Sequence, residues 1–133
     1  MVRVAFVCVG NAGRSQMAAA FAHKMAGSGV DIISGGTRPA KAVYPAVAEA
    51  MMEVGIDIAG NKPRLITPGE LADCDYVITM GCSSDEVCPV AFRGDARDWD
   101  LPDPKGRSLP EVRRIRDDIE KRVEMLLREI GNR

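Results

Sequence analysis

The sequence predicts an α/β fold built on a parallel β-sheet, and two observations carry this prediction. Short runs of apolar and β-branched residues, typical of buried strands, alternate along the chain with longer segments whose apolar residues recur at helical spacing. The 133 residues, of which 46% are hydrophobic, match the length of one domain around a single core. We therefore expect residues 1–133 to form a single domain in which strands and helices alternate.

The first half of the chain contains two strand–helix pairs. The expected elements are a strand over 2–8, a helix over 14–25, a strand over 30–33 and a helix over 43–54. Each expected helix is followed by a glycine, Gly27 or Gly55, and glycine is the residue favoured just past a helix C-terminus.

The second half contains two helix-start signals and one further strand. Thr67-Pro68-Gly69-Glu70 has the spacing of a capping box with proline at the first helical position, and it predicts a short helix to about Asp73. Residues 75–80 form a third apolar run. Ser108-Leu109-Pro110-Glu111 is a second capping box, which should open a last helix ending near residue 130. The segment 81–110 has no regular pattern, and long irregular segments in small domains are often functional.

The charge balance and the cysteine content exclude several classes of protein. Lys and Arg number 18 and Asp and Glu 19, so a strongly basic nucleic-acid binder is excluded. No apolar run reaches the roughly 18–20 residues of a membrane helix, and the apolar N-terminus lacks a signal-peptide cleavage site. We therefore expect a cytoplasmic chain with no nucleic-acid or membrane partner. In that reducing compartment the four cysteines, Cys8, Cys74, Cys82 and Cys88, are core residues, metal ligands or reactive thiols.

The loop between the first strand and the first helix carries the clearest chemical signature. Its sequence is Cys8-Val9-Gly10-Asn11-Ala12-Gly13-Arg14-Ser15. Backbone N–H groups converge where a tight loop enters a helix, and Gly10 and Gly13 permit the backbone angles of such a cradle. A tetrahedral oxyanion fits there, held also by the planar fork of Arg14. Loop amides, the helix dipole, Arg14 and the Ser15 hydroxyl should favour the thiolate of Cys8, a nucleophile beneath the anion.

Other interpretations of this loop explain less of it. A core cysteine followed by a glycine turn would not require an arginine and a serine at this spacing. The loop has no Gly-x4-Gly-Lys and no Gly-x-Gly-x-x-Gly, so it is neither of the common nucleotide-binding loops.

Cys82 follows the third strand, and Cys88 comes after a segment that looks able to unwind. Because parallel strands end on the same side of a sheet, we expect Cys8 and Cys82 to face one crevice. Such a thiol pair next to an activated nucleophile suggests a redox relay. The alternatives are two unrelated core cysteines or a zinc site, but the chain has no Cys-x2-Cys pair and His23 is remote. Cys74 precedes the strand and is expected to be a core thiol.

The motif Cys8-x5-Arg14-Ser15 near the N-terminus resembles the low-molecular-weight protein tyrosine phosphatase superfamily, which includes the thioredoxin-coupled arsenate reductases. Phosphatases usually continue Arg-Ser-Pro, whereas Gln16-Met17-Ala18 here is similar to the reductase branch, as are the segments 34–36 and 54–58. The resemblance covers essentially the whole chain. It implies a three-layer α/β sandwich with a central four-stranded parallel sheet, strand order 2-1-3-4 and a short fourth strand near Trp99.

The resemblance also implies a mechanism and roles for single residues. Cys8 would attack arsenate, Cys82 would attack the Cys8 sulfur and release arsenite, and Cys88 would attack Cys82. Thioredoxin or a similar dithiol protein would then reduce the Cys82–Cys88 disulfide. The oxyanion-binding residues would be Val9, Gly10, Asn11, Ala12, Gly13 and Arg14, with Ser15 beside the nucleophile. One departure is that five residues separate Cys82 from Cys88, where the familiar enzymes have six.

A carboxyl group is needed to protonate the departing oxygen, because the one histidine is remote. Asp98, Asp100 and Asp103 all lie in the irregular segment. Asp103-Pro104 matches the acid loop of the superfamily, so Asp103 is the expected acid and Asp100 the reserve. Phosphatases usually have tyrosine after Asp-Pro, whereas this chain has Lys105, which favours a small inorganic oxyanion over an aryl phosphate.

Supporting residues are expected around the loop. Asn11 matches the family asparagine that braces the cradle, with Ser34 behind it. Some relatives bind potassium through a glutamate at the position of Ala19, so no metal and no cofactor is expected here. Ordinary surface positions are expected for the three cations Arg38, Lys41 and Lys62.

Three functions follow from these residues. The first is an arsenate reductase acting in arsenical resistance, with weak phosphatase activity because phosphate shares the geometry of arsenate. The second is a low-molecular-weight phosphatase hydrolysing phosphomonoesters through a phosphocysteine, independent of Cys82 and Cys88. The third is a thiol sensor or oxyanion-binding module that binds without turnover.

Overall fold

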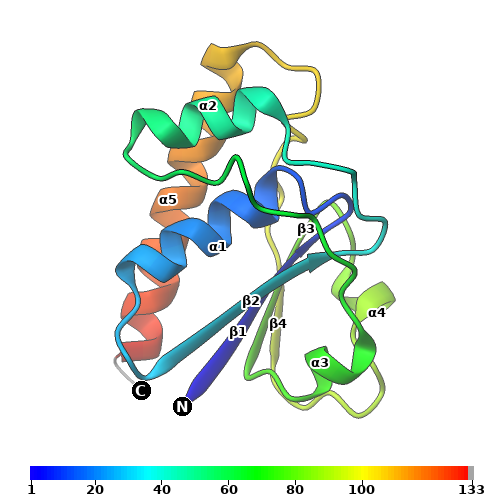
Figure 1. The fold of residues 1–133 in the computed structure, drawn as a ribbon. Coiled ribbons are helices and arrows are strands. Elements are labelled where there is room, and N and C mark those ends of the chain that lie inside the picture. Colours follow the sequence, from blue (N-terminus) through cyan, green and yellow to red (C-terminus); the bar gives the residue numbers. More distant parts are fainter. Residues whose placement is uncertain (132–133) are drawn as a thin grey trace.

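Four short strands form one parallel sheet in the computed structural model, which describes residues 1–131 (Figure 1). The strands are β1 (Val2–Cys8), β2 (Val30–Gly36), β3 (Tyr76–Met80) and β4 (Asp95–Asp98). Their order in the sheet is β2-β1-β3-β4, and every neighbouring pair is parallel. The two central strands β1 and β3 are the most apolar, because both of their faces are covered. The expected strand order and the short fourth strand before Trp99 are confirmed.

Helices cover both faces of this sheet and complete the three layers. The helices are α1 (Arg14–Met25), α2 (Pro45–Glu53), α3 (Pro68–Ala72), α4 (Ser84–Val87) and α5 (Leu109–Gly131). Figure 1 shows α1, α2 and α5 on one side of the strands and the short α3 and α4 on the other. Among residues 1–131, no helix is both long and apolar enough to cross a bilayer.

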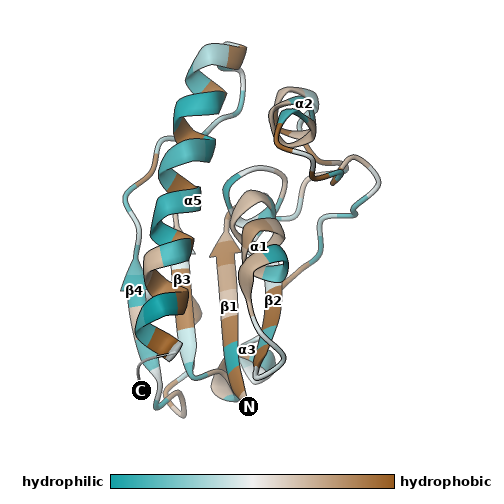
Figure 2. Cartoon of the chain, turned by 90° about the vertical axis from the view of Figure 1, so that its left-hand side faces the viewer, coloured by the Kyte–Doolittle hydropathy of each residue, from teal (hydrophilic) through white to brown (hydrophobic). Residues whose placement is uncertain are grey.

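Alternating side chains of β1 separate the core into two clusters. Val4, Phe6 and Cys8 point toward the long helices, where they pack in the larger cluster with residues of α1, α2 and α5. Ala5 and Val7 point the other way, into a smaller cluster that includes Leu71 of α3. Figure 2 shows the corresponding pattern on α5, with apolar bands facing the sheet between polar ones.

The predicted helix starts agree with the structure. Thr67 and Glu70 form the capping box of α3, with the Thr67 side chain accepting from the Glu70 N–H and the Glu70 carboxylate accepting from the Thr67 N–H. Ser108 and Glu111 make the same reciprocal pair at the start of α5. These signals were reliable because each depends on residues three positions apart.

Three boundaries differ from the sequence prediction. Strand β2 continues to Gly36, because its pairing with β1 runs on to Cys8 opposite Gly36. Helix α2 begins at Pro45, since Tyr44 has an extended backbone. The segment 81–110, expected to be irregular apart from the short strand near Trp99, also contains the helix α4.

Candidate active site

The loop between β1 and α1 is held in a fixed shape by the segment that follows β2. Four carbonyl groups of residues 8–12 accept hydrogen bonds from N–H groups of that segment. The pairs are Thr37 N to Cys8 O at 3.2 Å, Arg38 N to Val9 O at 2.8 Å, Ala40 N to Gly10 O at 2.9 Å and Tyr44 N to Ala12 O at 3.0 Å. Because peptide N–H and C=O groups point in opposite directions, this outward anchoring turns loop N–H groups inward. The predicted oxyanion cradle therefore has a structural basis.

Two hydrogen-bond donors converge on the sulfur of Cys8, which is 2% exposed at the end of β1. The Asn11 backbone N–H donates to Sγ at 3.2 Å, and the Ser15 hydroxyl lies 2.8 Å from it. The Asn11 side-chain amide also donates to the Ser15 oxygen at 2.8 Å, which leaves the Ser15 hydrogen free to point at the sulfur. Both contacts suit a sulfur nucleophile, whose reactive thiolate form accepts hydrogen bonds.

A buried polar network holds Asn11 in the left-handed conformation, with φ of 50°. Its Oδ1 accepts from the Arg64 N–H at 3.0 Å and from Gln16 Nε2 at 3.3 Å, and Gln16 also donates to the Asn11 carbonyl at 3.0 Å. Asn61 in turn donates to Gln16 Oε1 at 3.1 Å. Ser34 accepts a long bond from Asn11 at 3.5 Å, as expected. The roles of Gln16, Asn61 and Arg64 were not predicted, because no local pattern brings residues 61–64 to the loop.

Arg14 lies at the first turn of α1 with its guanidinium buried beside the loop. Nη1 donates to the carbonyl of Leu101 at 3.0 Å, and Nη2 lies 3.7 Å from Oδ2 of Asp103. Gly81, just after β3, has φ of 82°, and a Cβ there would lie 2.5 Å from both terminal nitrogens of Arg14. The guanidinium therefore occupies space that is open only because residue 81 is a glycine, a residue that the sequence did not assign to the site.

A small pocket opens above Cys8 and brings most of the predicted residues together. Its lining comprises Cys8, Gly10, Ala12, Gly13, Arg14, Tyr44 and Asp103. Asp103 is half exposed at its mouth, and Pro104 packs so closely on the loop that a Cβ on Gly13 would lie 2.7 Å from Pro104 Cγ. Neither Asp98 nor Asp100 lines this pocket. The geometry thus favours Asp103 over the reserve Asp100.

Tyr44 is an unpredicted member of the pocket. Burial raises the pKa of its phenol, and the negative charges of Asp103 and Cys8 raise that pKa further. The neutral hydroxyl can therefore donate to a bound anion. No local signal in the sequence marks Tyr44, because its place beside the loop depends on the packing of the segment after β2 against residues 8–12.

Cys82 does not share the pocket of Cys8, so the expectation of one common crevice is wrong for this reduced structure. Cys8 packs in the larger core cluster, whereas Cys82 packs against the smaller one on the opposite face, with its Sγ 3.8 Å from the Val7 carbonyl oxygen. Cys82 lines a neighbouring groove together with Val9, Thr37, Arg38, Gly81, Glu86 and Val87. Alternation along β3 would place Cys82 on the same face as Met80, but Gly81 between them has φ of 82°, so the chain leaves the extended path there.

All four cysteines are free thiols, and they differ in how deeply they are buried. Burial raises the pKa of Cys82 to about 11, and negative charge on Cys8 adds to this rise, so the two groups are close enough to interact. Cys88 follows α4, is partly buried against the smaller cluster and has a pKa raised mainly by burial. Cys74 donates to the Glu70 carbonyl at 3.3 Å at the other end of β3, as expected for a core thiol.

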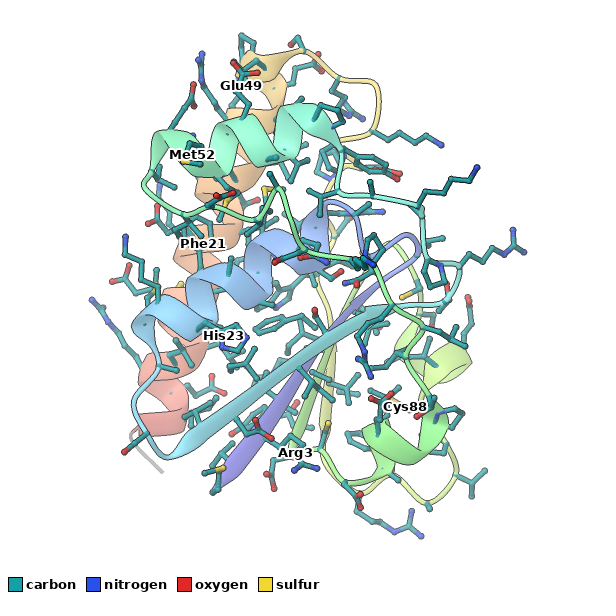
Figure 3. The ribbon with its side chains drawn as sticks, viewed as in Figure 1. Arg3, Phe21, His23, Glu49, Met52 and Cys88 are labelled. Atoms are coloured by element: carbon teal, nitrogen blue, oxygen red, sulfur yellow. The ribbon has the colours of Figure 1, made fainter. Side chains whose placement is uncertain are left out.

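The remaining predicted positions lie at the surface. His23 is exposed on α1, and Figure 3 shows it well apart from Cys88, which lies beside α3 and α4. Arg38, Lys41 and Lys62 are exposed, although Arg38 also borders the groove next to Cys82. Within residues 1–131, no three His, Cys, Asp or Glu side chains gather in a way that could hold a metal ion.

Known proteins are similar to this chain in sequence and in fold. Residues 3–133 match the family described as low molecular weight phosphotyrosine protein phosphatase. A putative arsenate reductase of Halobacterium salinarum is 49% identical over 123 residues, which cover 89% of this chain and 85% of that relative. The solved thioredoxin-dependent arsenate reductase Cg_ArsC1' of Corynebacterium glutamicum is 37% identical with a TM-score of 0.83, covering 98% of this chain and 62% of that one. The solved YwlE arginine phosphatase of Geobacillus stearothermophilus is 25% identical with a TM-score of 0.86, covering 99% and 94%.

Proposed function

This chain belongs to the low molecular weight phosphotyrosine protein phosphatase family, and from that premise we propose that it is an arsenate reductase with an intramolecular disulfide relay. The observation that carries the proposal is the placement of three thiols. Cys8 lies in the oxyanion loop, and Cys82 and Cys88 flank a four-residue helix beside it. Phosphatase chemistry requires only the first of these thiols, whereas reduction of an oxyanion requires a source of two electrons.

The pocket suits a small tetrahedral anion. Loop N–H groups, the N-terminus of α1 and the Arg14 guanidinium surround the space above Cys8 with positive electrostatic potential. The Leu101 carbonyl holds Arg14 before the anion arrives, and Gly81 leaves room for the guanidinium there, so little reorganisation is needed on binding. Arsenate and phosphate have the same shape and charge, and we expect both to bind.

The first chemical step joins Cys8 to arsenic. The thiolate attacks As(V), an As–S bond forms and an oxygen departs as water after receiving a proton. Asp103 at the mouth of the pocket is the proposed donor of that proton. A positioned acid of this kind contributes about 10²–10⁴-fold to such a step.

The next steps move electrons from sulfur to arsenic. The Cys82 thiolate attacks Cys8 Sγ, the As–S bond breaks with its electron pair on arsenic, and arsenite leaves as As(III). Cys88 then attacks Cys82, which restores the Cys8 thiolate and leaves a Cys82–Cys88 disulfide. Because Cys82 starts on the opposite face of β1, this sequence requires the segment 82–88 to move.

An external dithiol must reduce the final disulfide to complete the cycle. A protein dithiol such as thioredoxin is the proposed reductant, supported by the thioredoxin dependence of the Corynebacterium glutamicum relative. Cys88 is partly exposed beside Val90, which is 95% exposed, so a partner can approach this segment from solvent.

The second candidate function is phosphomonoester hydrolysis, which the same pocket favours. Cys8, Arg14 and Asp103 are sufficient for a phosphocysteine mechanism, and the arginine phosphatase relative shares the fold. In that case Cys82 and Cys88 would not take part in turnover.

Single-turnover chemistry distinguishes these functions. Reduced protein is mixed with arsenate, arsenite is counted per chain, and hydrolysis of an aryl phosphate is measured beside it. The variants are Cys82→Ser and Cys88→Ser, with Cys74→Ser as the matched control for a buried thiol outside the relay. We expect one arsenite per wild-type and Cys74→Ser chain and none for Cys82→Ser. Aryl phosphate hydrolysis that is indifferent to all three substitutions, without any arsenite, would establish the phosphatase. Binding of phosphate without either reaction would leave an oxyanion-binding module.

A further inference from the structure

We propose that Asp98 is a positioning residue that holds α4 folded while the relay thiols are reduced, and that its release permits the Cys82–Cys88 disulfide. This inference deepens the proposed function and rests on the relay described above. Asp98 is the last residue of β4 and lies outside the pocket of Cys8.

The disulfide cannot form while α4 is intact. A disulfide requires Cα atoms about 4.4–6.8 Å apart. Cys82 and Cys88 are six positions apart, which corresponds to about 9 Å along a helix axis even if every step were helical. Ser83 and Cys88 at the two ends of α4 have extended backbones, which rise more per residue than a helix does. Helix α4 must therefore unwind before Cys88 reaches Cys82.

Helix α4 has little stability of its own. It contains four residues, none of them buried, and helices this short are unstable in isolation. The Ser83 hydroxyl and the Ser83 carbonyl accept from the N–H groups of Asp85 and Glu86 at 3.1 Å each, and Cys88 N donates to Ser84 O at 2.9 Å. Outside these local bonds, Val87 packs partly buried on the smaller core cluster, and hydrogen bonds from β4 add to that contact.

Asp98, the last residue of the neighbouring strand β4, holds α4 through hydrogen bonds. Its Oδ1 accepts from the Ser84 backbone N–H at 3.0 Å, and its Oδ2 accepts from the Ser84 hydroxyl at 3.3 Å. The Thr79 hydroxyl on β3 donates to the same carboxylate, which fixes it against the sheet. These bonds keep Asp98 ionised, since the Thr79 bond and then the Ser84 bonds lower its pKa. One carboxylate thus ties the first residue of α4 to both β3 and β4.

The same carboxylate also weakens Cys88 as a nucleophile. Burial raises the pKa of Cys88, and the negative charges of Asp98 and Asp85 raise it further. Unwinding α4 would free the thiol from burial and from the fixed position near Asp98. The hydrogen bonds of Asp98 to Thr79 and Ser84, which we call the clamp, therefore couple the folding of α4 to the reactivity of the Cys88 thiol.

The step that Asp98 controls exchanges the Cys8–Cys82 disulfide for the Cys82–Cys88 disulfide. The Cys88 thiolate attacks Cys82 Sγ, a Cys82–Cys88 bond forms, and the Cys8–Cys82 bond breaks with its electron pair on Cys8. No net oxidation occurs in this exchange, because arsenate has already accepted the two electrons.

The test measures the Cys82–Cys88 equilibrium without arsenate. A Cys8→Ser chain is equilibrated with reduced and oxidised dithiothreitol, free thiols are alkylated in acid, and the disulfide is quantified by mass spectrometry. Adding Asp98→Ala should raise the equilibrium constant for disulfide formation about tenfold, the scale of one charge-assisted hydrogen bond. For a two-electron couple this corresponds to a reduction potential about 30 mV lower.

Three further variants separate the clamp from charge and from general stability. Asp98→Asn keeps one acceptor oxygen and should shift the equilibrium less than Asp98→Ala. Ser84→Ala removes only the side-chain bond on a partly exposed residue, and should give a smaller shift of the same sign even if Asp98→Ala folds poorly. Asp85→Asn removes a comparable charge without the clamp and should change the equilibrium less than twofold.

The outcomes are separable from the proposed function. An equilibrium unchanged by both Asp98→Ala and Ser84→Ala, or shifted equally by Asp85→Asn, overturns the clamp even if arsenite is produced. A lowered unfolding temperature without a shift in potential shows a merely structural role and also overturns it. A shifted equilibrium in a chain that reduces no arsenate supports the clamp and rejects the reductase.

Discussion

Replacing Gly81 with alanine is expected to disable oxyanion binding while leaving the protein folded. Gly81 has φ of 82°, and an added Cβ would lie 2.5 Å from Nη1 and Nη2 of Arg14 and 2.7 Å from its Cζ. Gly55 provides a matched control, because its φ is 83° and nothing lies within 4 Å of an added Cβ. The two substitutions therefore impose the same backbone strain, and only one of them displaces the guanidinium.

The magnitudes follow from these distances. An alanine in the left-handed region costs about 1–2 kcal/mol, so both variants should lose that much free energy of unfolding. Carbon atoms in normal contact lie about 3.5 Å or more from their neighbours, so Arg14 must retreat by about 1 Å in the Gly81→Ala protein. A displacement of that size in a positioned group costs about 10²-fold in function. We expect phosphate affinity to fall by that factor in Gly81→Ala and to be unchanged in Gly55→Ala.

The assay measures how phosphate protects Cys8 from iodoacetamide, with the modified peptide quantified by mass spectrometry and unfolding followed by circular dichroism. This readout reports the oxyanion site whichever reaction the protein performs. Wild-type phosphate protection in Gly81→Ala, or an equal loss in Gly55→Ala, would refute the inference that Arg14 needs the space left by Gly81.

Three other predictions concern the acid, a relay thiol and a helix contact. Asp103→Asn should slow arsenite formation in a single turnover by at least about 10²-fold at neutral pH, and a rate within a factor of two of wild type would exclude it as the acid. Because the pKa of Cys82 is about 11, its alkylation rate should rise about tenfold per unit from pH 7 to 10; a flat profile in peptide mapping would contradict the described burial. The hydrogen bonds of Arg113, with those of Arg116, lower the pKa of Glu53 to about 2. Glu53→Gln should therefore unfold at a lower temperature than wild type at pH 7. This difference should shrink as pH falls from 4.5 through 2, because the carboxylate is protonated first in the unfolded state and in both states only below the folded pKa.

Much of the fold could be predicted because its signals are local. Capping boxes at Thr67 and Ser108 are complete within four residues, and the apolar run over 2–8 identifies a central strand without knowledge of its neighbours. The β4 strand lacked such a signal. Its residues are largely exposed at the sheet edge, so no apolar alternation marks it.

The candidate site likewise contains residues that a local sequence signal predicts and residues that no local signal marks. The loop residues, Arg14 and Asp103 could be predicted, since motif spacing and the strand–loop–helix context are readable in sequence. Tyr44 and the contact of Gly81 with Arg14 could not, because both depend on how distant segments pack over the loop. The position of Cys82 on the far face of β1 depends on side-chain direction two residues past a strand, which periodicity does not determine.

The relay is tested most directly by trapping its first disulfide. Reduced Cys88→Ser protein is exposed to one equivalent of arsenate, quenched in acid and digested without reductant for mass spectrometry. We expect a Cys8–Cys82 disulfide in stoichiometric yield with one arsenite per chain, because the thiol that would resolve it is missing. Arsenite released without that disulfide, or with Cys8 joined to Cys74 instead, would contradict the proposed attack of Cys82 on Cys8.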